Sequence, residues 1–162
     1  MICYRKATLE DLEAIWNYNI RMDPDEPRNL RWKESYISRN LSGRAATYVV
    51  IADGEPVGEV TLDYFAEAHG HVQTRKVLAD GTTTAYITAL RIRKEFAGKG
   101  YASGLMKYME AEAKQRGIQR LTIGVEAAES RNLAMYLHWG YDCFRMYLEE
   151  CGELVLYYSK EL

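Results

Sequence analysis

The sequence predicts a mixed α/β fold, with one β-sheet that carries helices on both faces. The main observation is the order of segments: a strand, two helices, three strands, a helix, a strand, a helix and two strands, which gives seven strands. The helical segments are amphipathic, so each has an apolar face to bury against a sheet. With 162 residues, of which 48% are hydrophobic, the chain is expected to form a single domain over residues 1–162.

The first part of the chain predicts one strand and two helices. A short strand is expected over residues 2–6. Thr8 is the expected N-cap of the first helix, and Asp11, three residues later, completes a capping box. Apolar side chains recur along this helix at spacings of three, four or one residue, namely Leu9, Leu12, Ile15, Trp16 and Ile20. A second helix is expected over residues 30–41, and Gly43 ends it.

The middle of the chain predicts a β-hairpin followed by a long loop. Strands over residues 47–52 and 57–65 flank Asp53-Gly54, a dipeptide that favours the positive φ angles of a tight hairpin turn. Residues 66–83 are polar and have neither helical nor strand periodicity, so a loop is expected there. Loops of this length in compact domains are often functional.

The last part of the chain predicts alternating strands and helices. A strand over residues 84–92 leads through glycines into a helix that ends at Gly117. Three more strands are expected over residues 120–125, 142–148 and 153–159, with a tyrosine-containing helix between the first two. Because a helix separates the strands at 84–92 and 120–125, these two are expected to be parallel neighbours.

Composition argues against several classes of partner. The 21 basic and 23 acidic residues give a formal net charge of −2 without blocks of like charge, so neither nucleic acid nor a membrane is an expected partner. Three cysteines without a Cys-x-x-Cys pair predict neither a disulfide framework nor a zinc site. His69 and His71 stand without further ligands, so no metal is expected. The protein is expected to be cytoplasmic.

The most informative segment is a strand that runs through three glycines directly into a helix. Gly98, Gly100 and Gly104 cluster at this helix start. The first N–H groups of a helix lack intrahelical partners and the helix dipole favours negative charge, so such a loop can bind phosphate. A P-loop is excluded because Gly100 follows Lys99 where Ser or Thr is required, and a dinucleotide fingerprint lacks its third glycine at Ser103. On this segment alone, a tight turn without a ligand remains an alternative.

Two motifs resemble those of the GCN5-related N-acetyltransferases (GNAT). The run Ala97-Gly98-Lys99-Gly100-Tyr101-Ala102 resembles the family's acetyl-CoA loop, Arg or Gln, two residues, Gly, one residue, then Gly or Ala, and departs from it at Ala97. Residues 129–141, where a helix with a tyrosine ends in Gly140-Tyr141, resemble a later motif of the family. The resemblance implies a three-layer fold with a mixed, mostly antiparallel seven-stranded sheet. It also implies acetyl-CoA-dependent N-acetyl transfer.

The resemblance further implies how acetyl-CoA would bind. In the family, the fourth and fifth strands diverge, the pantetheine arm pairs with exposed backbone of the fourth strand, and the glycine loop binds the pyrophosphate. The implied cofactor-binding residues are Leu90, Arg91, Ile92, Ala97, Gly98, Lys99, Gly100, Tyr101, Ala102, Ser103 and Asn132. Acetyl-CoA is thus the expected cosubstrate, with no metal.

Two residues are candidates for the chemistry. Tyr136 occupies the position of the family's tyrosine acid, where its phenol would hydrogen-bond to the departing thiolate; packing in the core is the alternative. No motif identifies the base. Glu126 at the fifth strand is the first candidate, with Glu59 and Asp63 on the third strand as others, and a solvated carboxylate is the alternative for each. A base or desolvation is needed because an alkylamine has a pKa of about 10.4.

Two hypotheses about function stay open at this point. The first is direct transfer of an acetyl group, in a ternary complex, to a primary amine of a small molecule or protein. It is supported by the lack of a suitably placed cysteine, since Cys143 falls in the sixth strand. The second is a catalytically silent CoA-binding sensor or regulatory module, which Ala97 and the lack of a glutamate on the fourth strand keep open. No motif names the acceptor, although the loop at 66–83 is expected to govern its choice. Since relatives often form homodimers, a homodimer is a further expectation.

Overall fold

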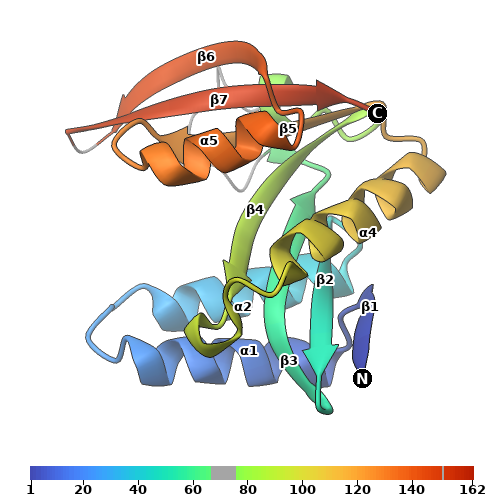
Figure 1. The fold of residues 1–162 in the computed structure, drawn as a ribbon, viewed down its shortest axis with the longest axis vertical. Coiled ribbons are helices and arrows are strands. Elements are labelled where there is room, and N and C mark those ends of the chain that lie inside the picture. The colour runs from blue at the N-terminus through green and yellow to red at the C-terminus, as the bar shows by residue number, and fades with distance from the viewer. Residues whose placement is uncertain (67–75, 151) are drawn as a thin grey trace. The chain divides into compact units, whose positions relative to one another are not determined.

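The computed structural model describes residues 1–66, 76–150 and 152–162, which contain a seven-stranded sheet with the order β1-β2-β3-β4-β5-β7-β6 (Figure 1). The strands are β1 (Ile2–Lys6), β2 (Ala45–Ala52), β3 (Glu55–Asp63), β4 (Thr84–Ile92), β5 (Arg120–Glu126), β6 (Cys143–Glu150) and β7 (Glu153–Glu161). The helices are α1 (Leu9–Met22), α2 (Asn29–Leu41), α4 (Tyr101–Gln115) and α5 (Ser130–His138), with a 3-10 helix η2 (Lys94–Phe96). The predicted fold class and order of elements are confirmed.

The chain divides into two compact units. Unit 1 comprises Met1–Leu62 and Ala89–Glu112, and unit 2 comprises Asp63–Thr88 and Ala113–Leu162. The chain therefore passes between the units within β3, β4 and α4. The single domain over residues 1–162 stays a prediction.

Helices cover both faces of the sheet in unit 1. Asn40 of α2 donates a hydrogen bond from Nδ2 to Thr47 Oγ1 (2.9 Å), so α2 lies on the face that Thr47 points toward. Tyr108 of α4 instead packs edge-on against Tyr48, with 5.9 Å between ring centroids. Thr47 and Tyr48 are successive residues of β2, and successive side chains of a strand point to opposite faces. Figure 1 accordingly draws α4 across β2 and β3.

The start of α1 has the predicted capping box. The Thr8 hydroxyl accepts a hydrogen bond from the Asp11 backbone N–H, and the Asp11 carboxylate accepts one from the Thr8 N–H at 2.7 Å. Arg5 of β1 donates to both carboxylate oxygens of Asp11. Burial raises the pKa of the Asp11 carboxyl. The hydrogen bonds from Arg5 and Thr8 lower this pKa by more, so that it lies below its ordinary value of 3.8. This one carboxylate thus joins β1 to the first helix.

Two backbone features shape the centre of the sheet. Asp53 and Gly54 have φ angles of 51° and 82°, as the predicted β2–β3 hairpin requires. The parallel register of β4 with β5 runs from Thr84 to Ile87 and does not continue to the end of β4. Two residues later Ala89 has a φ of 53°, an uncommon left-handed conformation for a residue that is not glycine.

In unit 2, β5, β7 and β6 form an antiparallel ribbon, and α5 packs against β5.

The expected loop at 66–83 is partly regular: residues 76–78 form a helical turn, and Asp80 bridges Phe65. The Asp80 carboxylate accepts hydrogen bonds from the backbone N–H groups of Thr82, Thr83 and Thr84, each at 2.9 Å. Sequence periodicity missed this turn because side-chain bonds to the backbone define it. His69 and His71 lie outside the described residues.

The bounds of the elements differ from prediction by one or two residues. The second strand begins at Ala45, two residues early, and the third covers 55–63 instead of 57–65. The helical turn η2 was not predicted because three residues give no periodicity.

Replacing Asp11 with Asn should destabilise the protein by about 1 to 2 kcal/mol at pH 7, since the cap and the ion pair to Arg5 are both weakened. A carboxyl with a lowered pKa stabilises the fold above its ordinary pKa and loses this contribution as the pH falls through the lowered value. The deficit measured by urea unfolding should therefore shrink as the pH drops below 3.8. Asp25→Asn, which removes an equal charge at an exposed position, is the control; an Asp11→Asn deficit independent of pH would contradict this account.

Candidate active site

The predicted phosphate loop lies in unit 1 between η2 and α4. Gly98 and Gly100 have φ angles of 76° and 79°, so both need the left-handed conformation that glycine adopts without strain. A Cβ built on either glycine would meet no other atom within 4 Å. The loop is thus open on the side where a Cβ of either glycine would lie. Helix α4 begins directly after the loop, at Tyr101. The open space and the unpaired N–H groups of the first helical turn suit a phosphate group.

Aromatic contacts support this loop. Phe96 of η2 stacks on Tyr101 of α4 with 6.3 Å between ring centroids, so the loop is closed at its two ends. The Lys99 ammonium lies 5.2 Å from the centre of the Phe96 ring. Ala97, at the position where the family has Arg or Gln, is exposed and offers no donor beyond its backbone. Phosphate binding here would depend on backbone N–H groups and the charge of Lys99.

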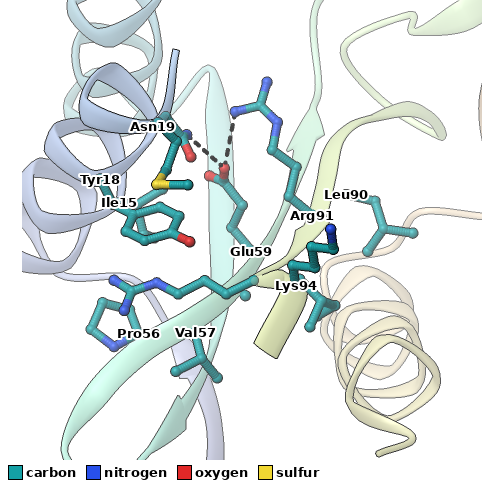
Figure 2. Close-up of a pocket in the computed structure, with 13 residues that line it drawn as sticks. Ile15, Tyr18, Asn19, Pro56, Val57, Glu59, Leu90, Arg91 and Lys94 are labelled. Atoms are coloured by element: carbon teal, nitrogen blue, oxygen red, sulfur yellow. Dashed lines mark hydrogen bonds and ion pairs between the residues drawn. The ribbon is translucent and has the colours of Figure 1, made fainter. Parts of the chain in front are cut away.

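A pocket of about 450 Å³ lies in unit 1, beside the end of the strand that leads to the glycine loop. It is formed by the C-terminal half of α1, the start of β3 and the end of β4, and Figure 2 shows its side chains. Its lining residues are Ile15, Tyr18, Asn19, Met22, Pro56, Val57, Gly58, Glu59, Leu90, Arg91, Ile92, Arg93 and Lys94. The pocket includes the whole segment Leu90–Ile92 that was predicted to bind the cofactor, and its volume suits a small ligand.

Glu59 is the buried carboxylate of this pocket, with 2% of its surface exposed. Its Oε1 accepts hydrogen bonds from Arg91 Nη1 (3.2 Å) and Asn19 Nδ2 (3.5 Å), whereas its buried Oε2 has no hydrogen-bond partner among the described residues. Burial raises the pKa of the Glu59 carboxyl above its ordinary value of 4.5, although Arg91 and Asn19 act in the opposite direction. Figure 2 shows Glu59 between Asn19 and Arg91, with a dashed line to each.

Arg91 of β4 and Arg93, the residue after β4, extend over aromatic rings of α1. The Arg91 guanidinium lies 5.2 Å from the centre of the Trp16 ring, and its side chain is 45% exposed. The Arg93 guanidinium lies 4.0 Å from the centre of the Tyr18 ring and pairs with Glu55 at 3.4 Å. The sequence did not predict that the side chains of both arginines would line a pocket.

The second motif of the sequence forms the end of α5 in unit 2. The N–H of Tyr141 donates to the Tyr136 carbonyl and that of Gly140 to the Leu137 carbonyl, each at 3.0 Å, and Gly140 has a φ of 94°. These are the two hydrogen bonds of a Schellman motif, and the completely buried Tyr141 fixes the end of the helix. The glycine and tyrosine of the motif therefore have a structural role that fixes the backbone of Tyr136.

The other predicted residues of unit 2 have carboxylate neighbours. Burial raises the pKa of the half-buried Tyr136 phenol, and the charge of Glu129 raises it further, so the phenol stays protonated at neutral pH. Asn132 donates to Glu129 Oε2 at 2.7 Å, which engages its amide within the helix. A hydrogen bond and charge repulsion with Glu153 raise the pKa of Glu126, which makes Glu126 a stronger base than an ordinary glutamate.

Two negative findings hold for residues 1–66, 76–150 and 152–162. No group of three or more His, Cys, Asp or Glu side chains is placed to hold a metal ion in these ranges. None of the helices within them combines the length and the apolar character that a membrane span requires.

Solved structures with the same fold are acetyltransferases. A GNAT-family acetyltransferase from Desulfovibrio desulfuricans superposes with a TM-score of 0.76 at 11% identity, over 99% of each chain. The PaiA N-acetyltransferase of Thermoplasma acidophilum, solved with coenzyme A, gives 0.66 at 19% identity over 100% of this chain and 99% of that one. NAA60 of Arabidopsis thaliana, solved with a bisubstrate analogue, gives 0.70 at 16% identity over 99% and 98%. The fold is thus that of the GNAT acetyltransferases.

The sequence itself decides the family. The family model for acetyltransferases of the GNAT family matches residues 7–141, which include the glycine loop, the pocket that contains Glu59 and Gly140-Tyr141. The chain therefore belongs to the acetyltransferase (GNAT) family, and its enzyme class is that of the N-acetyltransferases. Comparison with curated proteins found no match.

Replacing Glu59 with Gln should leave the protein at least as stable as the unmutated chain at pH 7. A carboxyl with a raised pKa binds its proton more tightly in the folded state, so stability falls as the pH rises above the ordinary value of 4.5. The neutral amide of the Glu59→Gln variant would remove this penalty, and the gain should disappear below pH 4.5. Urea unfolding at both pH values tests this, and a loss of more than about 1 kcal/mol at pH 7 would show that the carboxylate is a stabilising group.

Proposed function

We propose that this protein transfers the acetyl group of acetyl-CoA to a primary amine of a small molecule or a protein, by direct attack of the amine in a ternary complex. The observation that carries the proposal is the open loop of Gly98 and Gly100 at the start of α4, within the stretch that matches the family. The coenzyme A bound to the Thermoplasma relative supports the choice of cosubstrate.

The residues of the loop fit the pyrophosphate part of such a cosubstrate. Gly98 and Gly100 leave the space above the loop open, and backbone N–H groups of Tyr101 to Ser103 belong to the first turn of α4, where no intrahelical acceptor exists. Lys99 adds a positive charge. Leu90, Arg91 and Ile92 lie beyond the last residue of β4 that pairs with β5, Ile87, so that ladder does not use their backbone groups. A pantetheine amide is the kind of group that pairs with such a strand segment.

Two groups of the chain would serve the chemistry. Tyr136 is proposed as the hydrogen-bond donor to the leaving thiolate; with pKa values of about 10 for a phenol and 8.5 for a thiol, full proton transfer is uphill by roughly 2 kcal/mol, so it would act mainly by hydrogen bonding. Glu126 is proposed as the base that accepts the amine proton, directly or through water, and its raised pKa favours this role. Asn132 is retained as a cofactor contact, although Glu129 holds its amide.

Other parts of the proposal rest on the sequence alone. The acceptor, a homodimeric assembly and a cytoplasmic location stay predictions. The segment from residue 66 to 83 is proposed to govern acceptor choice. Within it, the Asp80 carboxylate is engaged by the backbone N–H groups of a turn. Glu59 is not proposed as the base, because its free oxygen is buried.

Replacing Gly100 with Val should weaken binding of coenzyme A by about tenfold, which corresponds to 1.4 kcal/mol, because a branched side chain would fill the space now open above the loop. Calorimetric titration with CoA measures the change.

The matched control is Gly117→Val. Gly117 also has a positive φ angle (95°) and open space at its Cβ position, so the variant introduces a similar backbone strain away from the loop. If both variants change the affinity for CoA equally, strain and not occupation of the loop is the cause, and the loop is no phosphate site.

Replacing Tyr136 with Phe should keep the fold and the affinity for CoA while lowering the rate of acetyl transfer by about 10 to 10³, the scale of one lost donor to a developing charge. Single-turnover rates with excess enzyme isolate this step from product release. Tyr147→Phe, at a tyrosine that is 61% exposed, is the control. Equal single-turnover rates for all three proteins would leave Tyr136 with the packing role only. Binding of CoA without turnover in the unmutated chain would instead favour a sensor.

A further inference from the structure

The pocket between α1, β3 and β4 has an excess of positive charge. Three cations, Arg91, Arg93 and Lys94, line it, against the single carboxylate of Glu59. The Glu59 side chain is 3% exposed, whereas that of Arg91 is 45% exposed. A ligand that enters the pocket therefore meets guanidinium and ammonium groups before it meets a carboxylate, which favours a ligand with a negative charge.

Arg91 is held in place by two neighbours, Glu59 and Trp16. Its Nη1 donates to Glu59 Oε1, which also accepts from Asn19, and its guanidinium lies over the Trp16 ring. A guanidinium has five N–H donors in a rigid plane, and the bond to Glu59 engages one nitrogen, so the exposed edge retains donors. Such a fixed edge matches the two oxygens of a carboxylate or a phosphate. Figure 2 shows the Arg91 guanidinium extending beside Glu59 at the pocket.

The interactions that position Arg91 cost free energy, so the stability of the fold does not explain their presence. Glu59 Oε2 and Trp16 Nε1 are buried side-chain atoms without a hydrogen-bond partner in the described part of the chain. Each buried polar atom without a partner costs about 1 to 3 kcal/mol. Buried ion pairs also contribute little net stability compared with apolar residues. A buried carboxylate that fixes the position of a partly exposed arginine is, however, the arrangement that a binding site needs.

The rest of the pocket indicates the size and polarity of the ligand. Ile15, Met22 and Val57 contribute apolar wall, and about 450 Å³ accommodates a molecule of amino-acid size. Arg93 is engaged with Glu55 and Tyr18, and Lys94 is an exposed second cation.

We propose that the acceptor of this enzyme is an amine that also carries a carboxylate or phosphate group, and that Arg91 recognises that anionic group, with Glu59 as its positioning residue. This inference rests on the proposed function, because it identifies the pocket as the site of the acetyl acceptor. It names the class of acceptor, which the proposed function leaves open.

Matched pairs of amines test the proposal. Leucine and leucinamide differ in the carboxylate, and O-phosphoethanolamine and ethanolamine differ in the phosphate. Turnover with acetyl-CoA is followed by release of the thiol. We expect the unmutated enzyme to have the lower KM for the anionic member of at least one pair, and the pair in which this occurs distinguishes a carboxylate from a phosphate. A lower KM for both neutral members would overturn the proposal.

The variants Arg91→Gln and Arg91→Lys link the preference to this side chain. Arg91→Gln should raise KM for the anionic amine by about tenfold and leave KM for its neutral partner within about twofold, since only a charged hydrogen bond is lost. Arg91→Lys keeps the charge and should recover part of the effect. Arg31→Gln, with the same charge change at an exposed position of α2, should change neither. Equal effects of Arg91→Gln on both members would overturn the proposal.

Because Arg91→Gln leaves a buried carboxylate without its cation, this variant can fail to fold. The double variant Glu59→Gln/Arg91→Gln removes both charges and is the second test, with the same expected loss of preference. Glu59→Gln alone should weaken the preference less than Arg91→Gln, because it releases Arg91 without removing it. A full preference in the double variant would overturn the role of Arg91.

Calorimetry separates this proposal from the proposed function. Leucine and O-phosphoethanolamine are titrated into protein saturated with CoA. Binding that depends on Arg91 without any turnover would support the anion site and contradict the acetyl transfer reaction. Turnover with amines that Arg91→Gln does not change would support the acetyl transfer reaction and contradict the anion site. If Arg91→Gln weakens CoA but not dephospho-CoA, the anion at Arg91 is the 3′-phosphate of CoA, and the acceptor proposal is wrong.

Discussion

The backbone of β4 is the constraint on which the site depends. Its first half pairs in parallel with β5 up to Ile87, and the left-handed φ of Ala89 follows two residues later. From there the strand continues to Ile92 without that pairing and leads into η2, the glycine loop and α4. A left-handed conformation that costs roughly 1 to 2 kcal/mol thus stands at Ala89, just after the parallel pairing ends. Structural strain of this kind is typical of functional segments.

The sequence predicted the fold well because its signals were local. Thr8 and Asp11 form the capping box they were expected to form, Asp53-Gly54 makes the hairpin turn, and alternation located the strands. The Asp80 turn and η2 were not predicted, because one side chain and one short turn define them without any periodicity. Glycine spacing likewise predicted the exposed loop of Gly98 and Gly100, since positive φ angles are what glycine permits.

The pocket was not predictable in the same way. Glu59 and Arg91 lie 32 positions apart on different strands, and no spacing rule connects them with Asn19 on α1. The charge of Glu59 suggested a solvated strand residue, but its environment is buried and its partner is a cation. Gly140-Tyr141 shows the opposite case, in which a motif associated with function also forms a helix end of the kind that usually has glycine. A motif reflects the backbone conformation that a short segment requires, whereas a pocket depends on the packing of segments that are far apart in the sequence.

The burial of Glu59 makes this carboxyl group a spectroscopic reporter for its own pocket. Its ionisation reflects a balance between the low polarity around Oε2 and the nearby Arg91 charge. An anion that draws the guanidinium toward itself would shift that balance and, with it, the carboxyl stretching band in the infrared spectrum. Selective ¹³C labelling of glutamate would make the occupancy of the pocket visible without any reaction taking place.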